Sequence, residues 1–137
     1  MDVEQARDFA RSNNRAVMAT YRRDGTAQLT PVVVAVADDG RLAVSTAEDT
    51  ARARNVRRDP RVAVCLLTER FYGASVQVTG TASILSLPEA MEPLVEYYRR
   101  AAGKEHPDWD EYRHAMVTDR RLVLRLRVEH AYGMVRP

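Results

Sequence analysis

The chain has 137 residues, of which 45% are hydrophobic and 29% are charged, and its formal net charge at pH 7 is +2. This composition excludes a fibrous or disordered chain and predicts a single globular domain over residues 1–137. The mild charge does not call for nucleic acid as a partner, and no stretch is apolar enough to predict a membrane partner. The first residues lack the features of a signal peptide, so we expect a cytoplasmic protein.

The first two thirds of the sequence predict one helix followed by a β-rich region. Asp2 can cap a helix that runs to about Asn13. Short turns, two of which carry an Asp-Gly pair, then separate apolar or alternating segments, which is typical of antiparallel strands. The predicted strands are Arg15–Arg22, Ala27–Ala37, Arg41–Thr46, Arg61–Thr68 and Ser75–Leu85. The single cysteine, Cys65, lies in the fourth strand, where we expect packing to bury it.

The last third predicts two helices and a closing pair of strands. Pro88 opens a helix that runs to about Ala102 and stops at Gly103, and a shorter helix capped by Asp108 follows to about Met116. The last predicted strands are Leu122–Val128 and Ala131–Val135. Six or seven strands with few helices predict a mainly β (α+β) fold, a small antiparallel barrel with peripheral helices.

The stretch from Ser45 to Pro60 is rich in arginine and lies where a predicted strand gives way to a short helix. Hydroxyl groups, the free N–H groups of a helix start and guanidinium groups converge at such a junction. Together they suit an anionic ligand. The alternative is a solvated basic helix face that holds no ligand.

Pro31 interrupts the apolar run of the second predicted strand. Proline cannot donate to a strand ladder, so it predicts a bulge or a strand at the edge of the sheet. Backbone groups left free at such a place suit the polar edge of a ring-shaped ligand. An edge strand without any ligand explains Pro31 equally well.

The remaining residues form no familiar catalytic or metal-binding pattern. The sequence has no GxSxG, Walker, GxGxxG or HExxH motif, and its three histidines stand in unrelated contexts, so we predict no metal site. Acidic residues at 108–111 are expected to cap a helix rather than to act as acid–base catalysts. Four aromatic residues are expected in the core or at an interface, or else stacked on a planar ligand. They are Tyr97, Tyr98, Trp109 and Tyr112.

Several short motifs occur in the order found in one protein family. They are Ala16-Val17-Met18-Ala19-Thr20, Asp24-Gly25, Thr30-Pro31-Val32, Ser45-Thr46, the block from Arg52 to Val62, Val78-Thr79-Gly80-Thr81-Ala82 and the block from Asp108 to Arg113. Over nearly its whole length the chain thereby resembles the split β-barrel flavin and deazaflavin oxidoreductases related to pyridoxamine 5′-phosphate oxidase. The run from Met116 to Leu122 and the pair Tyr132-Gly133 resemble the branch that uses coenzyme F420.

The resemblance implies a homodimer with two equivalent cofactor sites at its interface. It assigns to the cofactor Thr30, Pro31 and Val32 at the flat ring and Ser45, Thr46, Arg52, Arg54 and Asn55 at the phosphate end, and it has Gln77 and the second subunit help to close the cofactor pocket. No catalytic side chain and no metal are implied.

The cofactor stays open between coenzyme F420 and FMN. Relatives often carry basic residues where this chain has Glu48, Asp49 and Thr50, and a lysine where it has Arg52. Acidic side chains at those positions oppose a polyanionic tail. The last residues also lack the Arg-Leu-x-Pro pattern of true pyridoxamine phosphate oxidases, so vitamin B6 oxidation is not the preferred activity.

Three functions follow, in order of preference. The first is a reductase that uses reduced coenzyme F420 and passes hydride to a flat conjugated small molecule such as an enone, quinone or tetrapyrrole. The second is an FMN-binding oxidoreductase or flavin-binding protein of the same fold. The third is a non-enzymatic module that binds anions or nucleic acid, which ranks last because a recognition helix and interleaved aromatic residues are absent.

Overall fold

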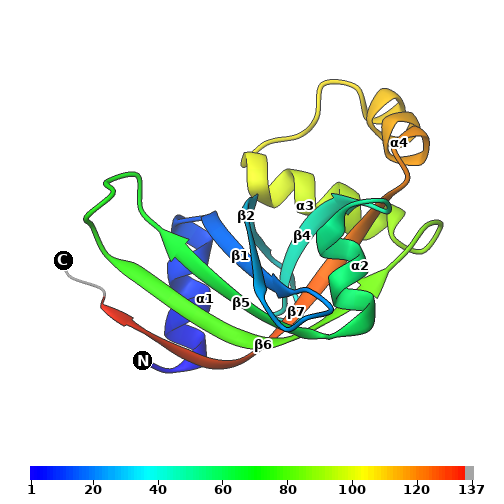
Figure 1. Ribbon diagram of the computed structural model, residues 1–137. Coiled ribbons are helices and arrows are strands. Elements are labelled where there is room, and N and C mark those ends of the chain that lie inside the picture. The colour runs from blue at the N-terminus through cyan, green and yellow to red at the C-terminus, as the bar shows by residue number, and fades with distance from the viewer. Residues whose placement is uncertain (135–137) are drawn as a thin grey trace.

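The computed structural model describes residues 1–134 as one curled sheet with four helices (Figure 1). The helices are α1(Val3–Ser12), α2(Ala51–Arg58), α3(Met91–Ala102) and α4(Trp109–Thr118). The strands are β1(Arg15–Tyr21), β2(Ala27–Val33), β3(Ala35–Val36), β4(Leu42–Ala47), β5(Arg61–Leu67), β6(Ser75–Leu85) and β7(Arg121–Met134). No helix within this range is long and apolar enough to cross a membrane.

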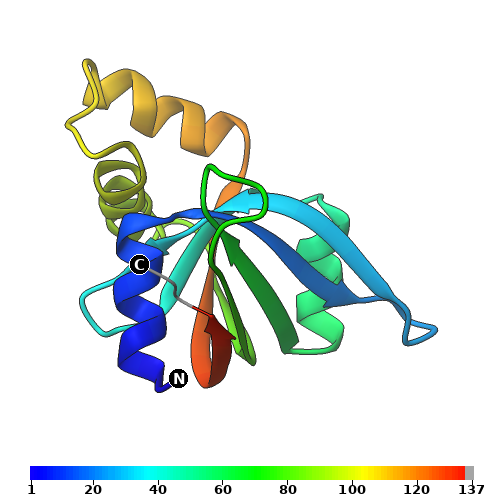
Figure 2. The same ribbon diagram turned by 90° about the vertical axis from the view of Figure 1, so that its left-hand side faces the viewer.

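The order of the strands forces the sheet to curl. Neighbouring strands pair antiparallel in the order β2-β1-β5-β6-β7-β4-β3, so β2 and β3 lie at opposite ends of the sheet. Only Val34 separates these two strands in sequence, and its N–H donates to the carbonyl of Asn14 (2.8 Å). The ends of the sheet therefore come together, which gives the half-open barrel seen in Figure 2. The predicted mainly β split barrel is confirmed.

Two hydrophobic clusters hold the helices to the sheet. The larger cluster fills the barrel with inward residues of the strands and includes Phe9 of α1 and Val56 of α2. The smaller one lies under α3 and α4, where Leu94 and Tyr112 pack near Val123 of β7. The helices thus cover the open barrel interior and the outer face of β4 and β7.

Local sequence signals predicted three helix ends correctly. The side chain of Asp2 accepts a hydrogen bond from the N–H of Gln5, and that of Asp108 accepts one from the N–H of Glu111. Gly103 ends α3 with φ 70°, a left-handed conformation that glycine adopts without strain. The structural role expected for the acidic residue at position 108 is therefore confirmed.

Other predicted boundaries are wrong. The strand expected over Ala27–Ala37 breaks at Val34, because the chain crosses there from one end of the sheet to the other. The helix expected from Pro88 begins at Met91, since residues 88–90 form a turn in which Ala90 N–H donates to the carbonyl of Ser86.

The two strands predicted over Leu122–Val128 and Ala131–Val135 form the single strand β7, as far as the described residues reach; Val135 lies outside them. Pairing with β6 shifts by one residue, because Thr79 pairs with His130 whereas Gly80 pairs with Val128. The extra residue, Glu129, forms a bulge that lets one strand bend around the barrel.

The outer face of β2, β1, β5 and β6 is largely apolar, and its residues belong to neither hydrophobic cluster. We call it the open face. The pairing places on it Leu29, Pro31 and Val33 of β2, Arg15, Val17 and Ala19 of β1, Ala63, Cys65 and Leu67 of β5, and Gln77 and Thr79 of β6. Leu29 is 67% exposed. Cys65 is partly exposed, so the prediction that packing buries it is wrong.

Tyr112 makes the stability of the fold depend on pH in the alkaline range. Its side chain is 8% exposed and donates a hydrogen bond to the carbonyl of Leu94 (2.7 Å), and burial raises its pKa to about 12. The unfolded chain releases this proton near the ordinary tyrosine pKa of about 10. Its contribution to stability is therefore present below about pH 10 and is lost as the pH rises toward about 12.

We expect the free energy of unfolding to fall by roughly 2 to 3 kcal/mol across that range. Urea unfolding from pH 8 to 11.5 measures the loss, and Tyr112→Phe serves as the comparison. The variant should be less stable at pH 8, where it lacks the hydrogen bond, but its stability should fall less steeply. Equal slopes for both proteins would contradict the assignment.

Candidate functional site

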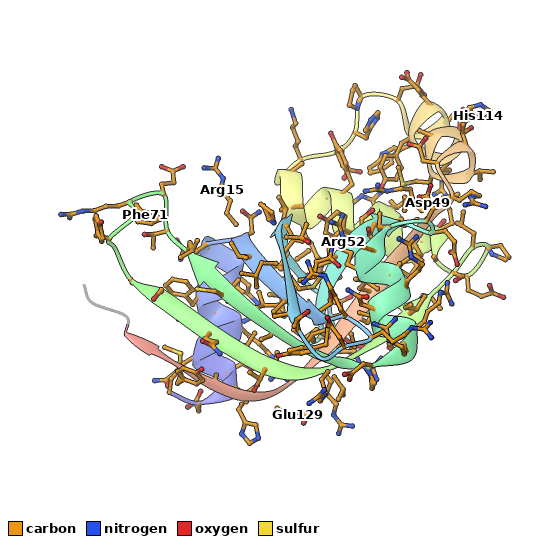
Figure 3. The ribbon with its side chains drawn as sticks, in the orientation of Figure 1. Arg15, Asp49, Arg52, Phe71, His114 and Glu129 are labelled. Atoms are coloured by element: carbon orange, nitrogen blue, oxygen red, sulfur yellow. The ribbon has the colours of Figure 1, made fainter. Side chains whose placement is uncertain are left out.

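A cleft of about 400 Å³ lies where β1, β2 and β4 meet α2 and α3. Its lining comprises Arg15, Ala16, Pro31, Val32, Val33, Val44, Ser45, Arg52 and Tyr97. Figure 3 shows Arg52 at the start of α2 and Arg15 at the start of β1. This lining contains two arginines and no acidic side chain, so the cleft favours an anion.

The start of α2 is fixed to the end of β4 by hydroxyl groups. Thr50 caps the helix by accepting a hydrogen bond from the N–H of Ala53 (3.3 Å), and its Oγ1 lies 3.0 Å from Oγ1 of Thr46. Thr46 is buried, so this contact is protected from water. The junction between strand and helix thereby holds Arg52, in the first turn of α2, at the cleft.

Arg52 carries a positive charge that the protein does not compensate. Its Nε is buried without a hydrogen-bond partner, and none of the carboxylates in the described part of the chain lies within 4 Å of it. Burial lowers the pKa of Arg52, and the nearby charge of Arg121 lowers it further. The side chain remains a cation, because the ordinary pKa of arginine exceeds 12. A bound anion would supply the missing partner.

A second guanidinium group reaches the same place from β7. Arg121 donates to Oγ of Ser45 through Nε (3.2 Å) and to the carbonyl of Ser45 through Nη2 (3.4 Å). It forms no ion pair with any residue up to 134. Arg121 thus contacts Ser45, which lines the cleft together with Arg52, and this arrangement suits the oxygen atoms of a phosphate.

Tyr97 of α3 forms an apolar wall of the cleft and holds α3 against β2. Its hydroxyl donates to the carbonyl of Val33 (2.8 Å), and burial raises its pKa, so the phenol stays neutral at pH 7. With Pro31, Val32 and Val44 it gives one side of the cleft an apolar surface next to the arginines. The cleft therefore joins an apolar part, suited to a ring, to a cationic end.

Four of the residues predicted for the cofactor lie together in the lining: Pro31, Val32, Ser45 and Arg52. Thr30 is next to them on β2, opposite Met18, without lining the cleft. β2 is an edge strand that runs without a bulge through Pro31, so of the two placements predicted for Pro31, a bulge or an edge strand, the edge strand is the one found.

The other predicted residues lie outside the lining. Asn55 is buried and donates to Oγ1 of Thr20 and to Oε1 of Gln28, both at 3.0 Å, which ties α2 to β1 and β2. Arg54 is exposed and donates to the carbonyl of Asp49 (2.6 Å). Thr46 supports Thr50, as described above, and Gln77 lies on the open face.

The acidic residues before α2 do not enter the cleft. The carboxylate of Glu48 pairs with Arg57, and neither Glu48 nor Asp49 belongs to the lining. The repulsion that these residues would exert on a bound anion is therefore reduced.

Sequence reasoning missed Arg121 and did not assign Tyr97 to the anion site. Arg121 reaches Ser45 because β7 pairs with β4, which is far away in the sequence, and no local pattern signals that pairing. Within residues 1–134, no group of three or more histidine, cysteine, aspartate or glutamate side chains could hold a metal ion.

Comparisons with known proteins agree on the family and the fold. The family described as Pyridoxamine 5'-phosphate oxidase matches residues 3–134. A conserved hypothetical protein from Mycobacterium tuberculosis is 28% identical with a TM-score of 0.82, over 98% of this chain and 85% of that one. A heme binding protein from Mycobacterium smegmatis is 19% identical with a TM-score of 0.74, over 96% of this chain and 53% of that one. A structure described as an F420 reductase is 20% identical with a TM-score of 0.64, over 88% of this chain and 90% of that one.

Proposed function

The chain belongs to the pyridoxamine 5′-phosphate oxidase family, and from this premise we propose that it is an oxidoreductase that binds coenzyme F420 in the cleft around Arg52. The proposed reaction is transfer of hydride from the reduced deazaflavin to a flat conjugated small molecule of the enone, quinone or tetrapyrrole type. The F420 reductase among its structural neighbours supports this choice of cofactor.

One observation carries the proposal: the buried Nε of Arg52 lacks a partner in a cleft without acidic residues. An unpaired buried donor costs about 1 to 3 kcal/mol, so the folded chain bears this cost unless a ligand relieves it. The phosphate of the cofactor would be held there by Arg52, Arg121 and the Ser45 hydroxyl.

The other end of the cleft suits a ring system. Pro31 and Val32 lie on an edge strand and offer an apolar surface, and the volume of about 400 Å³ is within the range of small-molecule sites. Reduced coenzyme F420, when bound, supplies hydride chemistry that needs no catalytic side chain. The residues of this chain bind, orient and exclude water, while Tyr97 holds α3 against β2.

We further propose that the protein is a homodimer that closes the cleft with its open face. Pro31 and Val33 belong both to that face and to the lining, so the cleft opens at its border. An apolar sheet face that no helix covers is a typical subunit contact. Gln77 lies within the face, so we keep the prediction that Gln77 and the second subunit help to close the cofactor pocket.

FMN is the alternative cofactor, since the family description points to flavin chemistry. The third function, a non-enzymatic anion- or nucleic-acid-binding module, has less support, because the arginines of α2 outside the cleft are engaged within the protein. Arg57 pairs with Glu48, and Arg58 donates to the carbonyl of Tyr21 (2.8 Å).

Parallel titrations of the purified protein with coenzyme F420 and with FMN test the proposal. Saturable binding of coenzyme F420, with weaker binding of FMN and oxidation of the reduced deazaflavin by a quinone, is the expected result. Tight binding of FMN without binding of coenzyme F420 would identify FMN as the cofactor. Binding of neither compound would overturn both. Light scattering after size exclusion checks the dimer, and a monomer would contradict that part.

A further inference from the structure

A second cavity of about 370 Å³ adjoins Tyr97, which also lines the cleft. It is bounded by α3, by the turn between β3 and β4, and by β7. Its lining comprises Ala35, Ala37, Asp38, Asp39, Ala43, Glu92, Pro93, Glu96, Tyr97, Arg100, Val123 and Arg125. Tyr97 is the residue that the two linings share.

Arg125 has the same unusual feature as Arg52. Among the described residues these two alone have a buried side-chain nitrogen or oxygen atom without a hydrogen-bond partner, and in both it is Nε. Each of the two arginines lines one of the two cavities. Arg125 lies on β7 opposite Ala43, whose short side chain leaves the guanidinium group room toward the cavity.

The acidic residues of the cavity are already engaged by other arginines. Asp38 pairs with Arg100, Glu92 pairs with Arg113 (2.7 Å), and Glu96 pairs with Arg99 (2.7 Å). The fourth, Asp39, lies 3.8 Å from Arg41. None of the carboxylates up to residue 134 lies within 4 Å of Arg125, so its charge is left without a counter-ion.

The rest of the cavity is apolar close to this charge. Alanine at positions 35, 37 and 43 leaves space over the sheet, while Val123, Pro93 and the ring of Tyr97 supply apolar contact. A ligand that fits has an apolar body for this surface and a single anionic group for the guanidinium, which binds carboxylates with two parallel hydrogen bonds.

We propose that the cavity between α3 and β7 is a second ligand site, in which Arg125 binds the carboxylate of a small organic acid with a flat or branched apolar body. The site is separate from the cleft around Arg52. Arg121 and Arg125 are four residues apart on one strand, which places them roughly 13 Å apart along β7. Tyr97 lines both cavities, but neither Arg52 nor Arg125 lines the other's cavity.

Benzoate and benzamide are suitable probes, because they share a ring and differ in charge. The protein without any redox cofactor is titrated with each and followed by the shifts of backbone amide signals in NMR spectra. Benzoate should move the amides of residues 123–125 and 94–97, and benzamide should bind roughly tenfold more weakly or worse. Because no cofactor is present, the outcome is independent of the proposed redox function.

Two variants and a matched control complete the test. Arg125→Met keeps an unbranched apolar stem but removes the guanidinium group, and it should weaken benzoate binding roughly tenfold or more. Arg127→Met removes an exposed charge from the same strand, outside the cavity lining, and should leave binding within about twofold.

If Arg125→Met fails to fold, Ala37→Leu decides the question, because it fills the cavity and leaves Arg125 in place. It should also abolish binding. The proposal is overturned if benzoate does not bind, if it moves only amides of the cleft around Arg52, or if the variant that folds binds it as well as the unchanged protein.

Discussion

Replacing Arg52 with alanine is expected to weaken the binding of coenzyme F420, or of FMN, by roughly 10- to 100-fold, which corresponds to the loss of a charge-assisted hydrogen bond. The Arg52 guanidinium lies in the cleft with a buried Nε and no partner. Titrations followed by cofactor fluorescence measure the change. The stability of the cofactor-free protein should stay unchanged or rise, because the substitution removes an unpaired buried donor.

Arg54→Ala is the matched control for this experiment. Arg54 belongs to the same helix, but it is exposed and donates to the carbonyl of Asp49 instead of facing the cleft. Its loss should change cofactor affinity by less than about twofold, as is typical of surface charges. Equal effects of the two substitutions would mean that the helix binds anions as a solvated basic face, without a built phosphate site.

Gly80→Ala is expected to destabilise the protein by roughly 3 kcal/mol or more. Gly80 lies on β6 beside the bulge at Glu129, and a Cβ atom there would lie 1.8 Å from the carbonyl oxygen of Arg127. That oxygen belongs to the paired strand, so it cannot move aside without breaking the ladder. Urea unfolding, with the yield of soluble protein as a second readout, measures the effect.

Gly103→Ala is the comparison for Gly80→Ala, because it changes the cost of the backbone conformation without creating a steric clash. Gly103 ends α3 with φ 70°, and nothing lies within 4 Å of an added Cβ atom. We expect a loss of about 1 kcal/mol, which is the usual cost of a left-handed conformation for a residue with a side chain. If Gly80→Ala were as mild as Gly103→Ala, β6 and β7 would not approach each other as closely as described.

Most elements could be predicted because their signals are local. Asp2, Asp108 and Gly103 mark helix ends through short-range hydrogen bonds or a special φ. The break at Val34 and the continuity of β7 could not be predicted, because both depend on which strands become neighbours in the sheet. An apolar run such as Ala27–Ala37 looks the same in sequence whether or not it crosses between the ends of a sheet.

The residues of the candidate site could likewise be predicted only where the sequence signal is local. The junction between β4 and α2 is a local feature that predicts an anion site, and the family resemblance assigns Arg52 to it. Arg121 comes to Ser45 only through the pairing of β7 with β4, and Tyr97 only through the packing of α3. Asn55 illustrates the opposite case, because a residue that motif resemblance assigns to the phosphate donates its amide to Thr20 and Gln28 in the interior.

The position of β7 has a consequence for synthesis on the ribosome. Of the strands within residues 1–134 it is made last, yet it lies between β6 and β4, which therefore have free edges until it emerges. Unpaired strand edges of nascent chains are prone to intermolecular association. Chains released before residue 121 would thus lack Arg121 and the strand β7, which joins β6 to β4. We expect such chains to aggregate rather than to accumulate as a shortened binding protein.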